Sequence, residues 1–202
     1  MAELTKVCVL KSGGEFKPKH VQWLARQIPG LVCLSDVLVD GVPTVRLRHN
    51  WPGWFSKFEL FRQDIAGDLL YFDLDTVVVG DIVELESARQ TTMLSDFYRP
   101  SVPASGLMFL KEADRNAVWD HWAADPRGHM RRAVTRACWG DQGIIREVYG
   151  DKVARWDAVA PGAVVSYKAD LKKMLAPEGA SVVCFHGKPR PWDVSHPWIP
   201  KL

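Results

Sequence analysis

The chain has 202 residues, 47% of them hydrophobic, which is enough for one substantial core and short for two. Its 26 Lys and Arg against 24 Asp and Glu give a formal net charge of +2, so overall charge indicates neither a nucleic-acid-binding nor a membrane-surface protein. No apolar run approaches the ~20 residues of a membrane span, and no secretory signal opens the chain, so we expect one cytoplasmic domain over residues 1–202. The four cysteines form no Cys-x-x-Cys pair and are expected to be free thiols.

Strand-like and helix-like segments alternate in the first part of the chain. Residues 6–10, 31–34 and 37–39 are predicted strands, and residues 20–28 form a predicted helix that ends at Pro29-Gly30. This alternation predicts an α/β fold with a parallel or mostly parallel sheet flanked by helices. In such folds ligands bind at the carboxyl ends of the strands.

The stretch 69–81, LLYFDLDTVVVGD, is the clearest signal in the sequence. Its apolar residues predict a buried central strand that contains Asp73 and Asp75. Successive strand side chains alternate, so both carboxylates should lie on one face, about 7 Å apart. Desolvation and mutual repulsion oppose two ionised carboxylates in an apolar setting, and a divalent cation relieves both. Oxygen ligands favour Mn²⁺ or Mg²⁺.

The other elements follow from capping, periodicity and turn residues. Ser56 is the expected N-cap of a helical segment over 57–66, and residues 97–103 read as a loop. Further expected strands are 91–94, 105–110 and 181–185, and expected helices are 114–124, 127–136 and 144–149. Four arginines in 127–136 form either a solvated helix face or an anion-binding patch.

Four groups converge in chain order: Asp73-x-Asp75, Ser105-Gly106, Asp141-Gln142, and the closing stretch 184–192, CFHGKPRPW. Together they resemble the retaining family 8 glycosyltransferases, which include glycogenin and bacterial galactosyltransferases. The resemblance covers roughly residues 6–192. It implies a single GT-A domain, Rossmann-like, with a mixed, mostly parallel sheet.

The resemblance also implies roles for individual residues. Asp73 and Asp75 would hold manganese (or magnesium) against the diphosphate of a nucleotide sugar, expected to be a UDP-sugar. Asp141 and Gln142 would be the catalytic pair beside the donor sugar, with retention of configuration. The implied substrate-binding residues are Lys57, Asp96, Ser105, Gly106, Gly187, Lys188, Arg190 and Trp192.

The closing stretch departs from the family pattern. The position of the metal-ligating His is Cys184, the usual Lys is Arg190, and the usual Asn before Ser-Gly is Ala104. His186 lies on the same predicted strand face as Cys184. A hard cation already bound by carboxylates favours imidazole over thiolate, so His186 is the predicted third ligand.

Two other functions fit parts of the sequence. Residues 72–76, FDLDT, also resemble the first motif of haloacid dehalogenase-type phosphatases, in which Asp73 would be the nucleophile and Asp75 a general acid. That motif normally follows the first strand of the core, whereas here about 70 residues of α/β pattern precede it. A non-catalytic nucleotide-sugar or carbohydrate-binding domain is the third possibility.

The acceptor is not determined by the sequence. The loop that contains His49, Trp51 and Trp54 suits a sugar or aromatic acceptor. The arginine-rich segment suits an anionic one, including modified nucleic acid. A glycan, a small molecule and a modified nucleic acid therefore all stay open as acceptors.

Overall fold

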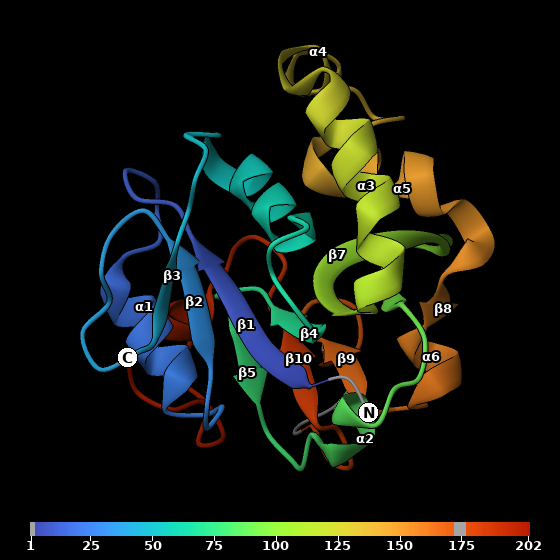
Figure 1. Ribbon diagram of the computed structural model, residues 1–202. Coiled ribbons are helices and arrows are strands. Elements are labelled where there is room, and N and C mark those ends of the chain that lie inside the picture. The colour runs from blue at the N-terminus through green and yellow to red at the C-terminus, as the bar shows by residue number, and fades with distance from the viewer. Residues whose placement is uncertain (1–2, 172–176) are drawn as a thin grey trace.

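The main sheet of the computed structural model, which describes residues 3–171 and 177–202, has seven strands in the order β3-β2-β1-β4-β7-β6-β8 (Figure 1). These strands are β1 (Leu4–Leu10), β2 (Val32–Ser35), β3 (Thr44–Arg46), β4 (Asp68–Phe72), β6 (Thr92–Asp96), β7 (Arg99–Leu110) and β8 (Ala154–Arg155). Strand β7 is antiparallel to both of its neighbours, β4 and β6, and the other pairs are parallel. The predicted mixed, mostly parallel α/β sheet is therefore confirmed.

Helices flank this sheet, and β4 is buried on both of its faces. The α-helices are α1 (Pro18–Ala25), α2 (Val83–Glu86), α3 (Glu112–Ala124), α4 (Pro126–Arg132), α5 (Gly140–Tyr149) and α6 (Trp156–Val159). The 3₁₀ helices are η1 (Gly53–Phe61), η2 (Gly150–Lys152) and η4 (Pro191–Asp193). Leu70 and Phe72 of β4 pack in one core with Trp23 of α1. Leu69 and Tyr71 face a second core that contains residues of η1, α3 and α5. A strand buried on both faces reads as a continuous apolar run, as β4 does in the sequence.

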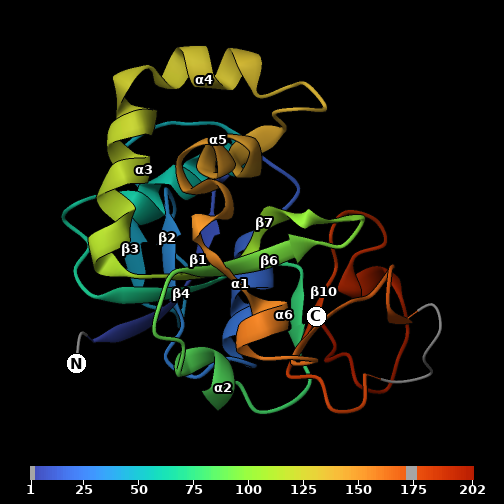
Figure 2. The ribbon, with the colours of Figure 1, turned by 90° about the vertical axis from the view of Figure 1, so that its right-hand side faces the viewer.

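The predicted strand over residues 69–81 is wrong in one respect, because it is two strands in two sheets. Strand β4 ends at Phe72, and β5 (Thr76–Val78) begins a three-stranded sheet in the order β5-β10-β9. Strand β10 (Val182–Cys184) pairs antiparallel with β5 and parallel with β9 (Val164–Ser166). Asp73 and Asp75 therefore lie in the turn between two strands, not on one strand face, and the Thr76 amide donates to the Asp73 carbonyl at 3.1 Å. Figure 2 shows β10 and the C-terminal segment beside the main sheet, next to this turn.

One other predicted strand and one predicted loop differ from the structure. Residues 37–39 are not a strand, and the edge strand β3 forms later, at Thr44–Arg46. The predicted loop 97–103 is mostly the first half of β7, despite Pro100 and Pro103. Only residues 107–110 of β7 pair with β4, so this half has β6 on one side alone, and such edge positions tolerate proline.

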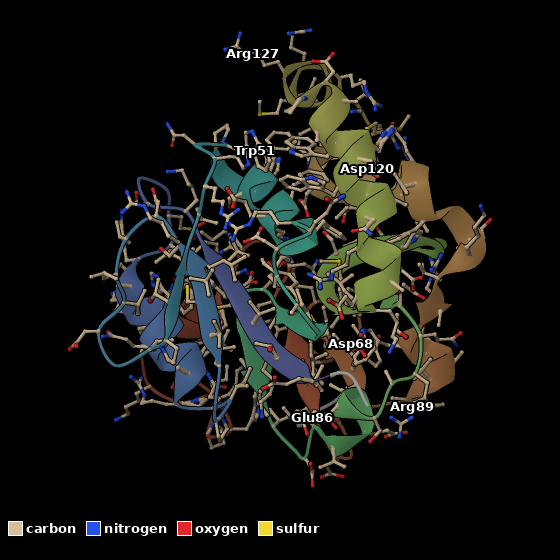
Figure 3. The ribbon with its side chains drawn as sticks, viewed as in Figure 1. Trp51, Asp68, Glu86, Arg89, Asp120 and Arg127 are labelled. Carbon is tan, nitrogen blue, oxygen red and sulfur yellow. The ribbon has the colours of Figure 1, made fainter. Side chains whose placement is uncertain are left out.

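Two predicted helices are also altered. In place of the helix expected over 57–66 the structure has the 3₁₀ helix η1, which begins earlier, at Gly53 with Pro52 as its N-cap, and ends at Phe61. The Ser56 hydroxyl donates to the Gly53 carbonyl at 2.7 Å instead of capping. Helix α4 ends at Arg132, so Arg136 lies in the following loop and the predicted helix 127–136 is too long. Arg127 projects from α4 into solvent at the top of Figure 3.

No helix in the described ranges is both long and apolar enough to cross a membrane. All four cysteines are free.

Candidate active site

A cavity of 580 Å³ opens where β1 and β4 end, at the carboxyl edge expected for ligands in an α/β sheet. It collects most of the residues selected from the sequence: Lys57, Asp73, Asp75, Asp96, Ser105, Gly106, Asp141, Gln142, His186, Gly187 and Arg190. They come from η1, the β4–β5 turn, the β6–β7 hairpin, the start of α5 and the chain after β10. Residues far apart in the sequence thus share one cavity.

Two of the predicted substrate-binding residues do not line this cavity. The Trp192 ring stacks on His20, with ring centroids 4.3 Å apart, and meets Phe16 and Trp23 edge-on. Lys188 has a side chain that is 68% exposed, and it forms ion pairs with Glu15 at 3.0 Å and Asp193 at 3.5 Å. Trp192 therefore anchors the tail against α1, and the substrate role of both residues stays a prediction.

Lys57 connects the carboxylate turn to the start of α5. Its ammonium lies 2.8 Å from Asp73 Oδ1 and 3.3 Å from Asp141 Oδ2. Ser105 Oγ donates to Asp141 Oδ2 at 2.6 Å, and the Tyr71 hydroxyl donates to Asp73. Burial alone would lower the pKa of Lys57, but Asp141 and Asp73 outweigh it and raise the pKa. Lys57 is therefore a permanent cation between the two carboxylates.

Gly106 permits the close approach that this network needs. The Asp73 amide donates to the Gly106 carbonyl at 3.0 Å. A Cβ atom at position 106 would lie 3.2 Å from Leu94 Cδ1 and 3.4 Å from Asp73 Oδ2. A side chain there would press on the end of Leu94 and reach van der Waals contact with the Asp73 carboxylate.

Asp75 is buried, 6% exposed, and binds the guanidinium of Arg190. Burial, together with the nearby Asp73, raises the pKa of Asp75 to about 7, although Arg190 and Lys57 act in the opposite direction. Arg190 also binds Glu15 through both a 3.1 Å and a 2.8 Å hydrogen bond, and its guanidinium lies 4.9 Å from the Phe16 ring centroid. The residue in the family's Lys position is thus held against the second carboxylate.

His186 lines the cavity but is engaged elsewhere. Its Nε2 lies 2.6 Å from Ser166 Oγ, and its ring stacks on Phe97 with centroids 5.0 Å apart. Burial and then Lys168 lower the pKa of His186 to about 4, so the ring is neutral at pH 7. Burial, and then Asp75 and Asp73, raise the pKa of the Cys184 thiol well above its usual value, which makes Cys184 a poor thiolate ligand. His186 as third metal ligand stays a prediction and requires its ring to use Nδ1 or leave Ser166.

The two carboxylates of the turn fit a divalent cation. Both are oxygen donors on a short turn at the cavity wall, and the raised pKa of Asp75 reports the buried charge that a cation would relieve. Among the described residues, no set of three ligand atoms within 4.8 Å of one another includes them. Mg²⁺ and similar ions are commonly held by one or two carboxylates together with substrate phosphates, so this pair is sufficient for such a site.

The one three-residue cluster of metal-ligand type in the described ranges lies elsewhere, between α3, α4 and α5. It consists of His121, His129 and Glu147. Arg132 already occupies it, because its guanidinium binds Glu147 and lies 2.6 Å from His129 Nδ1. This cluster is therefore an ion-pair network around Arg132 in the structure.

Glu15, Tyr71 and Trp139 also line the cavity and were not selected from the sequence. Tyr71 precedes Asp73 by two positions, and this spacing in an extended segment was the available signal for a shared face. Glu15 lies in the loop that follows the first strand, which is where the α/β pattern places ligands. Trp139 had no signal beyond its position next to Gly140-Asp141.

No protein-family model matches the chain, and a search of curated proteins gives no match. Several solved structures of similar fold are glycosyltransferases. The galactosyltransferase LgtC, solved with donor and acceptor sugar analogs, matches with a TM-score of 0.64 and 10% identity over 93% of this chain and 89% of its own. The glycosyltransferase GlyE of Streptococcus pneumoniae TIGR4 matches with a TM-score of 0.61 and 12% identity, and the match covers 96% of this chain but only 57% of GlyE. Mouse xyloside xylosyltransferase 1 matches with a TM-score of 0.53 and 10% identity over 92% and 98% of the two chains. The fold is therefore the GT-A glycosyltransferase fold.

Proposed function

We propose that the protein is a metal-dependent glycosyltransferase that transfers a sugar from a UDP-sugar to an acceptor with retention of configuration. The observation that carries this proposal is the shared cavity, which Asp73 and Asp75 of the β4–β5 turn line together with Asp141 and Gln142 of α5. The ammonium of Lys57 lies between Asp73 and Asp141. Glycosyltransferases of the same fold, among them LgtC with its donor and acceptor sugar analogs, support it.

Donor binding is assigned to the turn and the tail. Asp73 and Asp75 would hold the divalent cation, which supplies neutralisation of the charge that develops on the leaving diphosphate. Arg190 lies beside Asp75 and provides a guanidinium suited to phosphate oxygens. Gly187 has a φ of +83°, a conformation that glycine adopts readily, and it brings the tail backbone to the cavity wall.

The donor sugar is assigned to the start of α5. Ser105 and Lys57 both bind Asp141 Oδ2, at 2.6 and 3.3 Å, and so fix the orientation of this carboxylate. Gln142, the next residue, lines the cavity and offers an amide without charge. A fixed carboxylate and a neutral amide are suited to orient the hydroxyls of a bound sugar.

The phosphatase alternative has less support. Strand β4, which precedes Asp73, is the fourth strand along the chain, whereas the phosphatase motif is expected after the first. Asp73 also binds both Lys57 and Tyr71, and a carboxylate held by two donors is a weakened nucleophile. Cation binding by the same turn requires neither a position after the first strand nor a nucleophilic Asp73.

A nucleotide-sugar panel with MnCl₂ tests the proposal, because slow hydrolysis of the donor requires no known acceptor. We expect release of free UDP from at least one UDP-sugar, loss of that release with EDTA, and loss in the Asp75→Asn variant. Calorimetry with UDP should show binding with Mn²⁺ and none with EDTA. Equal UDP affinity in both conditions would remove the metal role, and turnover of a phosphate monoester that requires Asp73 would replace the transferase with the phosphatase.

A further inference from the structure

Two tryptophans at the cavity rim are exposed, in contrast to the rest of this residue type. All nine tryptophans lie in the described ranges, and only Trp54 and Trp139 are exposed, at 47% and 51%. Their ring centroids are 6.1 Å apart, and both rings line the cavity. Two large apolar rings side by side in water are unfavourable unless something covers them, and such patches mark binding sites.

Gly140 allows the Trp54 ring to pack close to the start of α5. Gly140 has a φ of +59°, and a Cβ atom there would lie 3.2 Å from Trp54 Nε1. The absence of a side chain lets the indole pack on the first residue of α5, directly before Asp141 and Gln142. The aromatic surface is therefore continuous with the proposed sugar site.

Few of the cavity-lining residues on the two segments beside these rings are charged. The cavity-lining residues of η1 and of the start of α5 are Gly53, Trp54, Ser56, Lys57, Gly140, Asp141 and Gln142. Lys57 and Asp141 are the only charged ones among them. They lie 3.3 Å apart, and Lys57 also pairs with Asp73 at 2.8 Å, so none of these residues offers an unpaired cation to an anionic ligand. This end of the cavity thus suits a neutral ligand.

The ring geometry separates a saccharide from a flat aromatic ligand. The two indoles are tilted by 44°, so they cannot clamp one planar ring between parallel faces. Successive units of an oligosaccharide are turned relative to one another, and each presents a C–H face that stacks on an indole. Neither indole N–H has a hydrogen-bond partner within residues 3–171 and 177–202, so both can donate to sugar hydroxyls.

We propose that Trp54 and Trp139 form the acceptor subsite and that the acceptor is a neutral oligosaccharide. The word acceptor rests on the proposed transferase function, whereas carbohydrate binding by these rings does not. Of the aromatic loop selected from the sequence, Trp54 alone takes part: the Trp51 ring stacks on His49 with centroids 4.2 Å apart, and neither residue lines the cavity.

Fluorine NMR of protein labelled with 5-fluorotryptophan tests the subsite directly. Single Trp→Phe variants assign the resonances, and the probes are neutral disaccharides built from glucose, galactose, mannose and N-acetylglucosamine. We expect at least one disaccharide to shift the Trp54 and Trp139 resonances saturably. Trp54→Ala should weaken that binding by about tenfold or more, as loss of a tryptophan anchor typically does. The matched control Trp51→Phe should bind it as the parent does.

Parallel calorimetry with UDP and Mn²⁺ separates the two proposals. If UDP binds and no disaccharide moves either resonance, the acceptor subsite is overturned and the transferase function stands. If N-acetyltyrosinamide shifts both resonances and no disaccharide does, the carbohydrate assignment is likewise overturned. If a disaccharide shifts both resonances and UDP does not bind, the carbohydrate site is supported and the transferase function falls.

Discussion

Lys57 places one ammonium group between two carboxylates from distant parts of the chain. Its side chain is 12% exposed, and Asp73 and Asp141 lie 2.8 and 3.3 Å away. Without this cation, two carboxylates at the cavity wall would face each other with little water to screen them. The position of a single lysine therefore decides whether the turn and the start of α5 can share one site.

Replacing Lys57 with methionine tests this charge balance. We expect Lys57→Met to lower the free energy of unfolding by about 3 kcal/mol, because it leaves the buried Asp141 and the partly buried Asp73 without their partner. Urea denaturation at pH 7 measures the effect. Lys6→Met is the control, since Lys6 pairs with Glu86 at 3.1 Å with side chains 24% and 29% exposed, and should cost about 1 kcal/mol or less. A Lys57 variant as stable as the Lys6 variant would show that the ammonium does not hold the two segments.

A double-mutant cycle on Asp73 and His186 tests whether both serve one cation. Asp73→Asn and His186→Ala should each weaken manganese-dependent UDP binding, the charged ligand more than the imidazole. Residues that act on one ion should couple by about 0.5–3 kcal/mol, measurable by calorimetry on the parent, both single variants and the double variant. His186 already contacts Ser166. If the His186→Ala variant binds manganese and UDP as tightly as the parent, His186 is not the third metal ligand. Cys184→Ser is then the next substitution to test.

At the scale of elements, the sequence predicted which residues lie in or beside strands better than it predicted where one strand ends and the next begins. The apolar residues on both sides of Asp73 and Asp75 are the same for one strand as for two. Only partners decide between them: β4 pairs with β1 and β7, whereas β5 pairs with β10 from the other end of the chain. Long-range pairing of this kind has no local signal. It explains why the carboxylates were found and their position in a turn was not.

In the helical part of the molecule, ion pairs connect α3, α4 and α5, and α4 is shorter than predicted. Arg132, the last residue of α4, binds Glu147 of α5, and His121 of α3 lies 3.2 Å from the same carboxylate. The remaining arginines of the segment, Arg127, Arg131 and Arg136, are exposed. One of the four arginines therefore has a structural partner that the sequence pattern could not identify, because Glu147 lies fifteen residues further along the chain.

The Arg132–Glu147 pair predicts a specific pH dependence of stability. The hydrogen bond from Arg132 is the largest of several effects that lower the pKa of Glu147 from 4.5 to about 2. A folded-state pKa below the unfolded one stabilises the protein fully above pH 4.5, and the contribution is lost as the pH falls towards 2. Glu147→Gln should therefore lower the free energy of unfolding by about 0.5–1 kcal/mol at pH 7, since both side chains are partly exposed.

Urea denaturation of parent and Glu147→Gln at pH 7, 4.5 and 3 measures this difference. It should shrink at pH 3. Glu84→Gln is the control, because Glu84 is exposed and has no ion pair among the described residues, so the variant loses a carboxylate charge without losing an ion pair. A difference for Glu147→Gln that stays constant down to pH 3 would show that the carboxylate is not held by Arg132.

At the scale of the whole molecule, the fold brings the two sheets together at one cavity and pairs every acidic residue there. The cavity is lined by five acidic side chains: Glu15, Asp73, Asp75, Asp96 and Asp141. Each has a cation: Lys57 serves Asp73 and Asp141, Arg190 serves Glu15 and Asp75, and Arg99 lies 3.4 Å from Asp96. Four of these five carboxylates were selected from the sequence. The only cation that the sequence implied for any of them was the metal ion at Asp73 and Asp75.

This pairing bears on the stereochemistry of transfer. Inversion requires a general base that removes the acceptor proton as the donor bond breaks. Each cavity carboxylate is already bound to a Lys or Arg side chain, and Asp75, whose pKa burial raises to about 7, is assigned to the divalent cation in the proposed function. The neutral His186 is the remaining cavity residue of that type, and its Nε2 already lies 2.6 Å from Ser166 Oγ. We therefore expect retention, as the resemblance to the family 8 enzymes also implies. Proton NMR of the sugar released by donor hydrolysis, recorded before mutarotation, should show first the anomer that matches the donor. An inverted first product would identify a free base in the cavity, and loss of that product in His186→Ala would assign the base to His186.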